Sequence, residues 1–555
     1  MNKKWWNNSV VYQVYPKSFN DTNQGGIGDL NGIIEKLDYL KELGIDVIWL
    51  SPVYESPMDD NGYDISDYEN ISKEFGTMEE MDRLIEEADN RGMKIIMDLV
   101  INHSSDEHRW FIESKSSREN PKRDWYIWRD GNEGGSSPNN LRSIFGGSCW
   151  EFDEGTGQYY FHSFSKKQPD LNWENPHLRE EIYRMVRWWL DKGIGGFRVD
   201  AITFIKKPEK FIEEVSDGID GLRVVKPNQP GVGEFLAELK EKTFAHYDIF
   251  TVAEAPGVEL DQLAEYSGDD GYFDMLIRFD HVDLDLAEDG KWYTNKKWSL
   301  VDFKKAISKN QEAIKGNYTT ALYLENHDQP RSLNRSIPKE DINERSAKLL
   351  ATSYFFLKGM PYIYQGQEIG MTNIEYSTIE SYDDISTIDQ YNAALEAGYS
   401  KEKAMSFVYR RSRDNARTPM QWSDKENAGF SEVSPWLQVN PNYKEINVKK
   451  ALENKDSLFY YYQDLIKLRK NPTYVDVLMS GDYEELFKDH LEVFVYLRQL
   501  NDQKLLVITN FSNEDVHLDL NEKAKQIVIG NYEDTPMLDG EVMVRPYECM
   551  VYELD

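Results

Sequence analysis

The sequence predicts an α/β protein whose core is a (β/α)8 TIM barrel, with a small inserted subdomain after the third strand and a C-terminal antiparallel β-sandwich domain. Short β-rich apolar runs alternate with amphipathic helical patterns eight times, which is typical of such a barrel. A barrel typically needs about 250 residues. The chain has 555, so the remainder must form an insertion and a further domain. We expect the barrel at 1–103 and 171–475, the inserted subdomain at 104–170 and the β-sandwich at 476–555.

The barrel strands are expected where β-rich apolar runs are bounded by polar residues. Amphipathic segments separate these runs: residues 30–43 carry apolar side chains at helical spacing before Gly44, and residues 178–192 do so before Gly193. A glycine directly after such a segment favours the end of a helix, because it adopts the left-handed conformation without strain. The eight predicted strands are residues 10–15, 47–50, 95–100, 196–200, 250–254, 275–279, 321–324 and 361–364.

Two regions depart from this alternation. Residues 104–170 are rich in aromatic residues, Gly, Ser and Asn without a sustained helical period, which indicates an irregular excursion from the loop side of the barrel. After the helix-like segment 458–470, short runs such as LEVFVYL, KLLVITNF and QIVIG are separated by polar turns, which is typical of antiparallel strands. Residues 375–403 are polar and helix-like, and the sequence assigns them no role.

Composition and charge exclude several classes of protein. With 98 acidic and 64 basic side chains the formal net charge is −34, which repels nucleic-acid phosphates and anionic lipid surfaces alike. A hydrophobic content of 40% is too high for a disordered chain. No run approaches the roughly 20 apolar residues of a spanning helix, and the start of the chain does not resemble a signal sequence. We therefore expect neither a nucleic-acid nor a membrane partner.

Cysteine usage indicates the compartment. Cys149 and Cys549 are too few for a disulfide framework or a cysteine metal site, which is typical of a reducing interior. We therefore expect a cytoplasmic protein. The sequence carries no clear signal for oligomerisation, and a monomer is favoured.

Polar side chains end four of the predicted strands. A single Asp or Glu at such a position is more often a turn former or a helix cap. In a barrel, however, the carboxyl ends of all strands meet on one face, so six such residues are expected to converge in one pocket. Carboxylates, a guanidinium and imidazoles without a phosphate-binding glycine loop predict an acid-assisted site for a polyhydroxylated substrate. The six residues are His103, Arg198, Asp200, Glu254, His327 and Asp328.

These motifs resemble a known enzyme family along essentially the whole chain. MDLVINH, GFRVD, TVAE and ENHD are similar to the four main signature regions of the α-amylase superfamily, glycoside hydrolase family 13. QPDLNW, NGYDISDY, PYIYQGQEIGM and RDNARTPMQW resemble markers of its oligo-1,6-glucosidase, dextran glucosidase and α-glucosidase branch. The resemblance implies Asp200 as nucleophile, Glu254 as general acid/base and Asp328 as the carboxylate that stabilises the transition state.

The chemistry of that family requires the same parts. Cleavage of a glucosidic bond with retention needs one ionised carboxylate and one protonated carboxyl group. Arg198 precedes Asp200 by two positions on one strand, so both side chains face the same side and the guanidinium favours the ionised nucleophile. Glu254 lies among Val252, Ala253 and Pro256, apolar neighbours that favour its protonated form.

The resemblance also implies a pocket for one terminal glucose. Asp60 and Arg417 are expected to hold the far hydroxyl groups of that glucose, and Tyr63 to lie beneath its ring. Such a closed end implies an exo-acting enzyme. Phe145 and Phe164 are expected to form the entrance walls. The complete expected substrate-binding set is Asp60, Tyr63, His103, Phe145, Phe164, Gln168, Arg198, His327 and Arg417.

Markers of linkage preference disagree. Valine is typical after the nucleophile of α-1,6-preferring members, whereas this chain has Ala201. The QPDLNW motif instead favours the 1,6 group. Ala255 and Pro256 follow the acid/base, where some dextran glucosidases place a tryptophan. Isomaltose, short isomaltooligosaccharides, maltose and sucrose all stay open as substrates, with a slight preference for broad α-glucosidase activity.

The first barrel loop, DTNQGGIGD, resembles a calcium loop. Oxygen ligands are expected from Asp21, Asn23, the Ile27 carbonyl and Asp29, but Gly25 stands where a third carboxylate is expected. Fewer anionic ligands weaken the binding of a hard cation. A structural calcium ion and a glycine-rich turn without an ion are both consistent with the loop, and the chemistry itself requires no cofactor.

Three alternatives stay open beside the exo-α-glucosidase. A trehalose-6-phosphate hydrolase needs a cationic phosphate site and tends to have Ala where this chain has Pro169. A sucrose isomerase tends to carry an arginine-rich loop where this chain has SLNRSIPK. A non-catalytic carbohydrate-binding scaffold of the same fold lacks the carboxylates that are present here.

Overall fold

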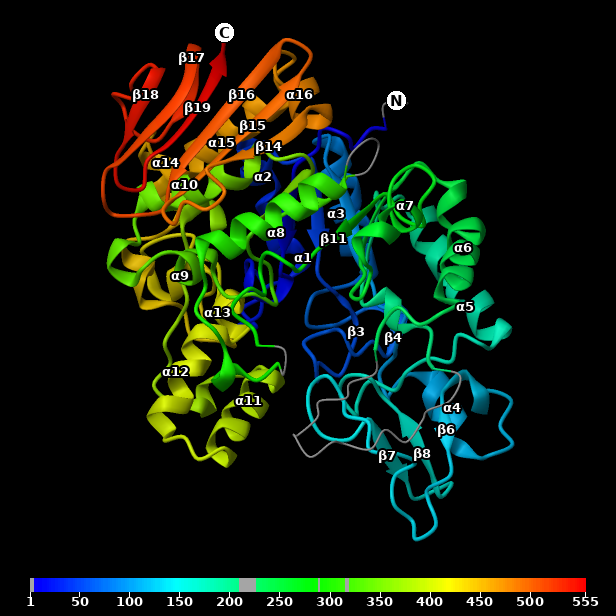
Figure 1. The fold of residues 1–555 in the computed structure, drawn as a ribbon. Coiled ribbons are helices and arrows are strands. Elements are labelled where there is room, and N and C mark those ends of the chain that lie inside the picture. The colour runs from blue at the N-terminus through cyan, green and yellow to red at the C-terminus, as the bar shows by residue number, and fades with distance from the viewer. Residues whose placement is uncertain (1–3, 209–225, 288–289, 315–318) are drawn as a thin grey trace.

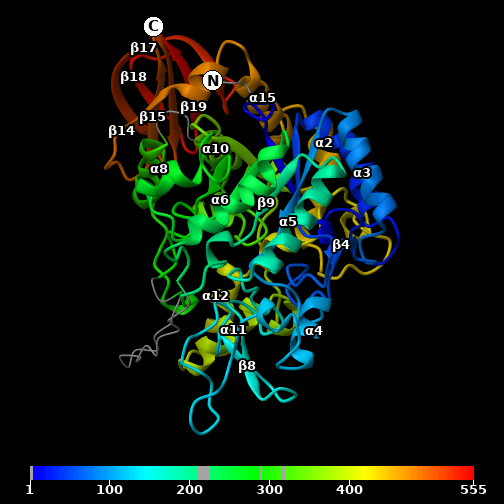
Figure 2. The same ribbon diagram turned by 90° about the vertical axis from the view of Figure 1, so that its right-hand side faces the viewer.

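The computed structural model describes residues 4–208, 226–287, 290–314 and 319–555. The barrel occupies the middle of the molecule. In both views the C-terminal sheet lies at one end, and the inserted subdomain and helices α11 and α12 lie at the other (Figure 1, Figure 2). No helix in these described ranges is long and apolar enough to cross a membrane.

Eight parallel strands form the barrel, which confirms the predicted fold class. Their order is β11-β10-β9-β5-β2-β1-β13-β12. A parallel bridge between Leu276 and Thr320 joins the two outermost strands and closes the ring. The strands are β1 (Val11–Val14), β2 (Val47–Leu50), β5 (Lys94–Leu99), β9 (Gly196–Val199), β10 (Phe250–Glu254), β11 (Met275–Ile277), β12 (Ala321–Leu322) and β13 (Met360–Tyr364).

Helices cover the outside of the barrel with one apolar face. In α3, Thr77 and Glu80 form a capping box, and Met81, Leu84 and Ala88 are buried at helical spacing. The predicted helix 30–43 is two helices that meet at Lys36, whose backbone leaves the helical region. The helices are α1 (Leu30–Glu35), α2 (Leu37–Leu43), α3 (Met78–Asn90), α4 (Arg109–Ser116), α5 (Pro176–Asp191), α6 (Val232–Lys242), α7 (Leu263–Tyr266), α8 (Leu300–Ala313), α9 (Ser332–Ser336), α10 (Glu344–Phe355), α11 (Ile385–Glu396), α12 (Lys401–Arg411), α13 (Asp414–Arg417), α14 (Val448–Glu453), α15 (Leu458–Lys470) and α16 (Val475–Ser480).

A small helix-and-sheet region lies within residues 104–170, the stretch predicted as an inserted subdomain. It contains α4 and a three-stranded antiparallel sheet in the order β6-β8-β7, with β6 at Trp128–Arg129, β7 at Trp150–Asp153 and β8 at Gln158–Phe161. Cys149, Trp150 and Phe161 are buried in its own apolar core. A second short sheet pairs β3 (Tyr54–Glu55) with β4 (Asp67–Ile71) in the preceding barrel loop.

The helical pair α11 and α12 occupies the stretch to which the sequence assigned no role. Tyr391, Ala394, Phe407 and Val408 are buried between these two helices and the segment around Trp292. This pair therefore adds a second wall beside the carboxyl ends of the strands, on the side away from the inserted subdomain (Figure 1).

The C-terminal region is an antiparallel sheet in the order β14-β15-β16-β19-β17-β18. The long strand β17 pairs with β18 through its first part and with β19 through its last part, with register shifts between them. Arg498, with its side chain fully buried, donates to the Phe356 carbonyl (2.7 Å) and so ties the sheet to the barrel. The strands are β14 (Asp482–Leu486), β15 (Val493–Leu500), β16 (Gln503–Asn510), β17 (Val516–Gly530), β18 (Asp539–Val544) and β19 (Cys549–Leu554).

Candidate active site

A cavity of about 490 Å³ opens at the carboxyl ends of the barrel strands. The inserted subdomain supplies one wall, and Leu286, Gly290 and Trp292 with α11 supply the other. All three predicted catalytic carboxylates line this cavity, as do five of the expected substrate-binding residues. These eight residues are Asp60, Tyr63, His103, Phe145, Phe164, Asp200, Glu254 and Asp328.

The backbone of β9 brings the central charges together. Its first residue, Gly196, has a φ of +140°, and a Cβ atom there would lie 1.8 Å from the Phe250 carbonyl oxygen of β10. Only glycine permits this close approach of the two strands. In the resulting register Arg198 lies opposite Asp98 on β5. Parallel pairing therefore sets a guanidinium beside a carboxylate before any substrate arrives.

Arg198 is the centre of the charge network. Its side chain is 2% exposed, and its Nη1 donates to Asp200 and to Asp98, each at 2.6 Å. Its Nη2 donates to Glu254 at 2.6 Å. The backbone N–H of Ala201, a residue with positive φ where β9 ends, also donates to Glu254 (3.3 Å). One fixed cation thus orients both carboxyl groups toward the cavity.

The two carboxyl groups differ in their affinity for a proton. Burial raises the pKa of Asp200 to about 6, and the Arg198 guanidinium opposes that rise. Burial also raises the pKa of Glu254, to about 8, with further increases from the negative charges of Asp200 and Asp328. At neutral pH Asp200 is therefore ionised while Glu254 holds a proton. This is the division that acid-assisted nucleophilic displacement requires.

Asp328 stays ionised across the range in which the other two carboxyl groups titrate. Burial alone raises its pKa, but the charges around it outweigh that effect and hold the pKa well below its usual value. Its carboxylate lies 3.0 Å from His327 Nε2, 2.8 Å from Arg417 and 3.2 Å from Arg413. A permanent negative charge therefore faces the centre of the cavity.

Asp60 and the two arginines of the RDNARTPMQW motif lie in one charged cluster, and the expected contact of Asp60 and Arg417 with the sugar stays a prediction. Arg413 contacts the Asp60 carboxylate (3.3 Å) and lines the cavity. Arg417 is 1% exposed, bonds to Asp328 and the His327 carbonyl, and is not among the described residues that line the cavity. The two arginines stand four positions apart in one motif, so they share a helical face but lie at different depths.

Gln168 and the histidines support the lining residues. Gln168 Nε2 donates to Asp60 (3.1 Å) and lies 3.2 Å from His103 Nε2. Burial lowers the pKa of His103, which favours its neutral form. The Tyr63 ring stacks on His327 with centroids 5.4 Å apart, and its hydroxyl lies 2.7 Å from His327 Nε2. Gln168 and His327 therefore position other residues. Neither is among the described residues that line the cavity.

Sequence reasoning missed several residues of the site. Asp98 and Arg413 lie inside MDLVINH and RDNARTPMQW, two motifs already identified in the sequence, so these motifs could have indicated both residues. Ser386 and Gln390 of α11 also line the cavity, and no sequence pattern indicated them. Gln390 accepts a hydrogen bond from the Trp292 backbone (3.0 Å), which joins the two parts of this wall.

A buried lysine joins the inserted subdomain to the barrel. The Lys207 ammonium forms an ion pair with Asp170 (2.5 Å) and donates to Asn102 (2.7 Å) and to the Phe204 carbonyl. Asn102 in turn contacts His103 (3.2 Å). Phe204 and His103 both line the cavity. The pair therefore fixes the base of the wall that the subdomain contributes.

The loop expected to bind calcium is held by its own backbone. The carboxylates of Asp21 and Asp29 each accept three backbone N–H groups, and Asn23 accepts that of Gly25. Ile27 is half-buried in the same loop. Within the described ranges there is no group of three or more His, Cys, Asp or Glu side chains suited to a metal ion. A structural calcium ion here stays a prediction.

Comparisons with known proteins extend over the whole chain. The family model "Alpha amylase, catalytic domain" matches residues 13–477, and "Alpha-amylase SusG C-terminal domain" matches residues 493–551. An oligo-1,6-glucosidase from Bacillus cereus is 50% identical over 100% of both chains. A trehalose-6-phosphate hydrolase from Bacillus subtilis is 44% identical over 99% of this chain and 98% of that protein. The crystal structure of an isomaltulose synthase from Erwinia rhapontici NX5, in complex with its natural substrate sucrose, has a TM-score of 0.95 at 41% identity and covers 100% of both chains.

Proposed function

The chain belongs to the α-amylase family, glycoside hydrolase family 13, and is an α-glucosidase; from this premise we propose that it removes terminal glucose from short α-glucosides with retention of configuration. One observation carries the proposal. Asp200 and Glu254 are held by the same guanidinium, yet their pKa values of about 6 and about 8 leave one ionised and the other protonated at neutral pH.

The proposed reaction is a double displacement. The Asp200 carboxylate attacks the anomeric carbon, the bond to the glucosidic oxygen breaks, and Glu254 gives its proton to that oxygen. A covalent glucosyl-enzyme results. Glu254, now ionised, takes a proton from water, whose oxygen attacks the anomeric carbon and releases Asp200. The ionised Asp328 faces the positive charge that develops on the sugar ring in both steps.

The exo mode rests on the charged cluster at the far side of the cavity. Arg413 joins Asp60, Asp328 and Asp384 in one network, the last contact being 2.6 Å. These charged groups offer donors and acceptors to the hydroxyl groups of a terminal glucose ring. Because the network fills the space behind that ring, a longer chain cannot continue past it.

The substrates proposed are isomaltose, short isomaltooligosaccharides and maltose, with sucrose as a further candidate. Ala201 is small and leaves room beside the nucleophile, while Phe145, Phe164 and Trp292 offer apolar surfaces to a second sugar unit. The relatives named oligo-1,6-glucosidase favour the 1,6 linkage. We therefore expect activity on both linkages.

Hydrolysis of trehalose 6-phosphate is the second candidate, favoured by the relative of that name. The charges of the cavity argue against it. Among the described residues that line the cavity, Arg413 is the one cation, and it already contacts three carboxylates. A phosphate group is held better by several guanidinium groups than by one that already binds three carboxylates.

The test is glucose release from isomaltose, maltose, sucrose and trehalose 6-phosphate, measured in parallel on the wild type and on Asp200→Asn. We expect release from the first two, and a loss of about 10⁴-fold or more in the variant, because the nucleophile is missing. NMR of the first product shows whether the released glucose has the α configuration. Release from trehalose 6-phosphate alone, or β-glucose as first product, would overturn the proposal. An unchanged thermal unfolding midpoint shows that Asp200→Asn is folded.

A further inference from the structure

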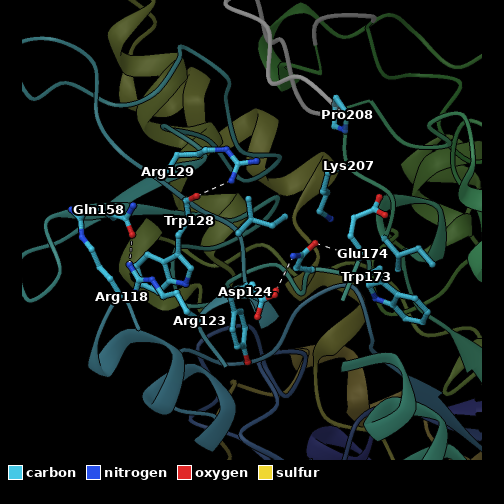
Figure 3. A pocket seen from close by; sticks show the side chains of 14 residues that line it. Arg118, Arg123, Asp124, Trp128, Arg129, Gln158, Trp173, Glu174, Lys207 and Pro208 are labelled. Atoms are coloured by element: carbon cyan, nitrogen blue, oxygen red, sulfur yellow. Dashed lines mark hydrogen bonds between the residues drawn. The ribbon is translucent and has the colours of Figure 1, made fainter. Parts of the chain in front are cut away.

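A second cavity of about 420 Å³ lies beside the inserted subdomain. Its walls are β6, the start of β8 at Gln158, the helical turn 123–125, the barrel loop 172–174, and Ile205, Lys207 and Pro208 (Figure 3). Among the described residues it shares no lining residue with the catalytic cavity. We call it the cationic pocket.

Positive charge gathers in this pocket in a chain whose net charge is −34. Of its described lining residues four are cations, Arg118, Arg123, Arg129 and Lys207, and two are anions, Asp124 and Glu174. Glu174 pairs with Lys206, and Lys207 pairs with Asp170. Arg118 contacts Asp130 at 3.1 Å on the exposed rim. Among the described lining residues, three guanidinium groups therefore stand against two carboxylates.

The contacts of Arg123 indicate which kind of ligand this positive charge suits. Its guanidinium donates to neutral groups: the Ser114 carbonyl (3.0 Å), Thr156 Oγ1 (3.0 Å) and Gln158 Oε1 (2.7 Å). Burial lowers its pKa to about 10; the charge of Asp153 opposes that effect, and the nearby Arg118 adds to it. A partly buried guanidinium among neutral acceptors and a second guanidinium is stabilised when an anion binds.

The aromatic side chains argue against a neutral sugar as the ligand. The Trp128 ring is covered by the Arg123 guanidinium, 3.5 Å from its centroid, and stacks on Phe111 at 5.6 Å. Trp173 is 1% exposed and packs against Phe235. Sugar rings bind to open aromatic faces, and both indole rings here are already covered.

We propose that the cationic pocket binds the phosphate group of a sugar-sized phosphate monoester. A phosphate carries about −1.5 to −2 charges and three peripheral oxygens, which suits several guanidinium groups better than one carboxylate does. Arg118, Arg123 and Arg129 hold the phosphate. The remaining volume accommodates one hexose ring, with Gln158 and Asn172 as hydroxyl partners.

The experiment is isothermal titration calorimetry of the full-length protein at constant ionic strength. Glucose 6-phosphate and inorganic phosphate are the two probes. The test variant is the double substitution Arg118→Gln with Arg129→Gln, which spares the partly buried Arg123. The matched control is Arg184→Gln, because Arg184 is 44% exposed, as against 47% for Arg118, and lies outside both cavities.

We expect one saturable site for glucose 6-phosphate in the wild type and in Arg184→Gln, and binding at least tenfold weaker in the double variant. Equal affinity for inorganic phosphate would overturn the sugar-sized part of the proposal. No saturable binding, or equal binding by the double variant, would overturn all of it; the second result would place glucose 6-phosphate in the catalytic cavity. Unchanged glucose release from maltose by the double variant shows that it is folded and keeps failure here separate from failure of the proposed function.

Discussion

The catalytic cavity and the cationic pocket use the same side chain in opposite ways. Beside the catalytic cavity Arg198 donates to the carboxyl groups of Asp98, Asp200 and Glu254, each at 2.6 Å, and it opposes the rise that burial causes in the pKa values of Asp200 and Glu254. In the cationic pocket Arg123 donates its hydrogen bonds to neutral oxygens, and the charges of Asp153 and Asp130 act on it from farther away. The groups that face a buried guanidinium therefore decide whether it shifts the pKa values of neighbouring acids or attracts an anion.

The variant with the largest expected effect on this comparison is Arg198→Gln. It leaves Asp98, Asp200 and Glu254 buried together without a cation, which raises the pKa of Asp200 further and disfavours the ionised nucleophile. Removing one preorganised electrostatic contact from an active site lowers kcat by about 10²- to 10³-fold. We therefore expect a fall of about this size in kcat for glucose release from maltose, with Arg184→Gln as control. A fall of less than tenfold would contradict the central role of Arg198.

A second test concerns the cation between the two cavities. Lys207→Met leaves Asp170 buried and unpaired, and we expect the free energy of unfolding to fall by about 3–5 kcal/mol. Chemical denaturation followed by fluorescence measures it. The exposed pair of Lys192 with Asp82 provides the control, since Lys192→Met is expected to cost less than about 1 kcal/mol. Equal costs for the two variants would show that the buried pair does not hold the wall.

Arg413→Gln tests the clamp on the terminal glucose. It removes charged hydrogen bonds worth about 1.5–3 kcal/mol, so we expect kcat/KM for maltose to fall about 10- to 150-fold. Gln168→Ala is a milder comparison, because this side chain supports Asp60 from outside the cavity. If Arg413→Gln had no effect while Gln168→Ala did, the proposed clamp would be wrong.

The pH dependence of kcat/KM reports the two catalytic carboxyl groups. Asp200 must be ionised, so activity is expected to fall as the pH drops below its pKa of about 6. Glu254 must be protonated, so activity is expected to fall as the pH rises above its pKa of about 8. A bell-shaped profile with about a tenfold loss per pH unit outside these limits is expected. A profile that is still rising at pH 9 would contradict Glu254 as the proton donor.

The smallest effect is expected for a single substitution in the cationic pocket. Arg129→Gln alone changes the unfolding free energy by less than about 0.5 kcal/mol and leaves maltose hydrolysis unchanged, because Arg129 is exposed and lies outside the catalytic cavity. Thermal unfolding without and with glucose 6-phosphate measures both states. A large loss of stability without the ligand would show that the cationic pocket is a structural feature of the subdomain.

Much of the fold was predictable because local physics dictates it. The end of a helix at a glycine and the formation of a strand by a β-rich run both depend on residues that are neighbours along the chain. Residues 47–50 and 250–254 accordingly form strands with the predicted bounds. The convergence of Asp200, Glu254 and Asp328 was also predictable, since parallel strands place their carboxyl ends on one face. Helix 30–43 was predicted too long, because a periodic apolar face does not reveal the break at Lys36.

The sequence by itself determined the barrel, the strand ends that carry the carboxylates, and the motifs around them, because these follow from periodicity and from the order of residues along the chain. Only the tertiary structure decided that Arg413, and not Arg417, contacts Asp60, that Ser386 and Gln390 of α11 complete the wall, and that Arg123 contacts Thr156 and Gln158. These are contacts between segments distant in sequence, and no local preference encodes which of two similar side chains reaches the shared space.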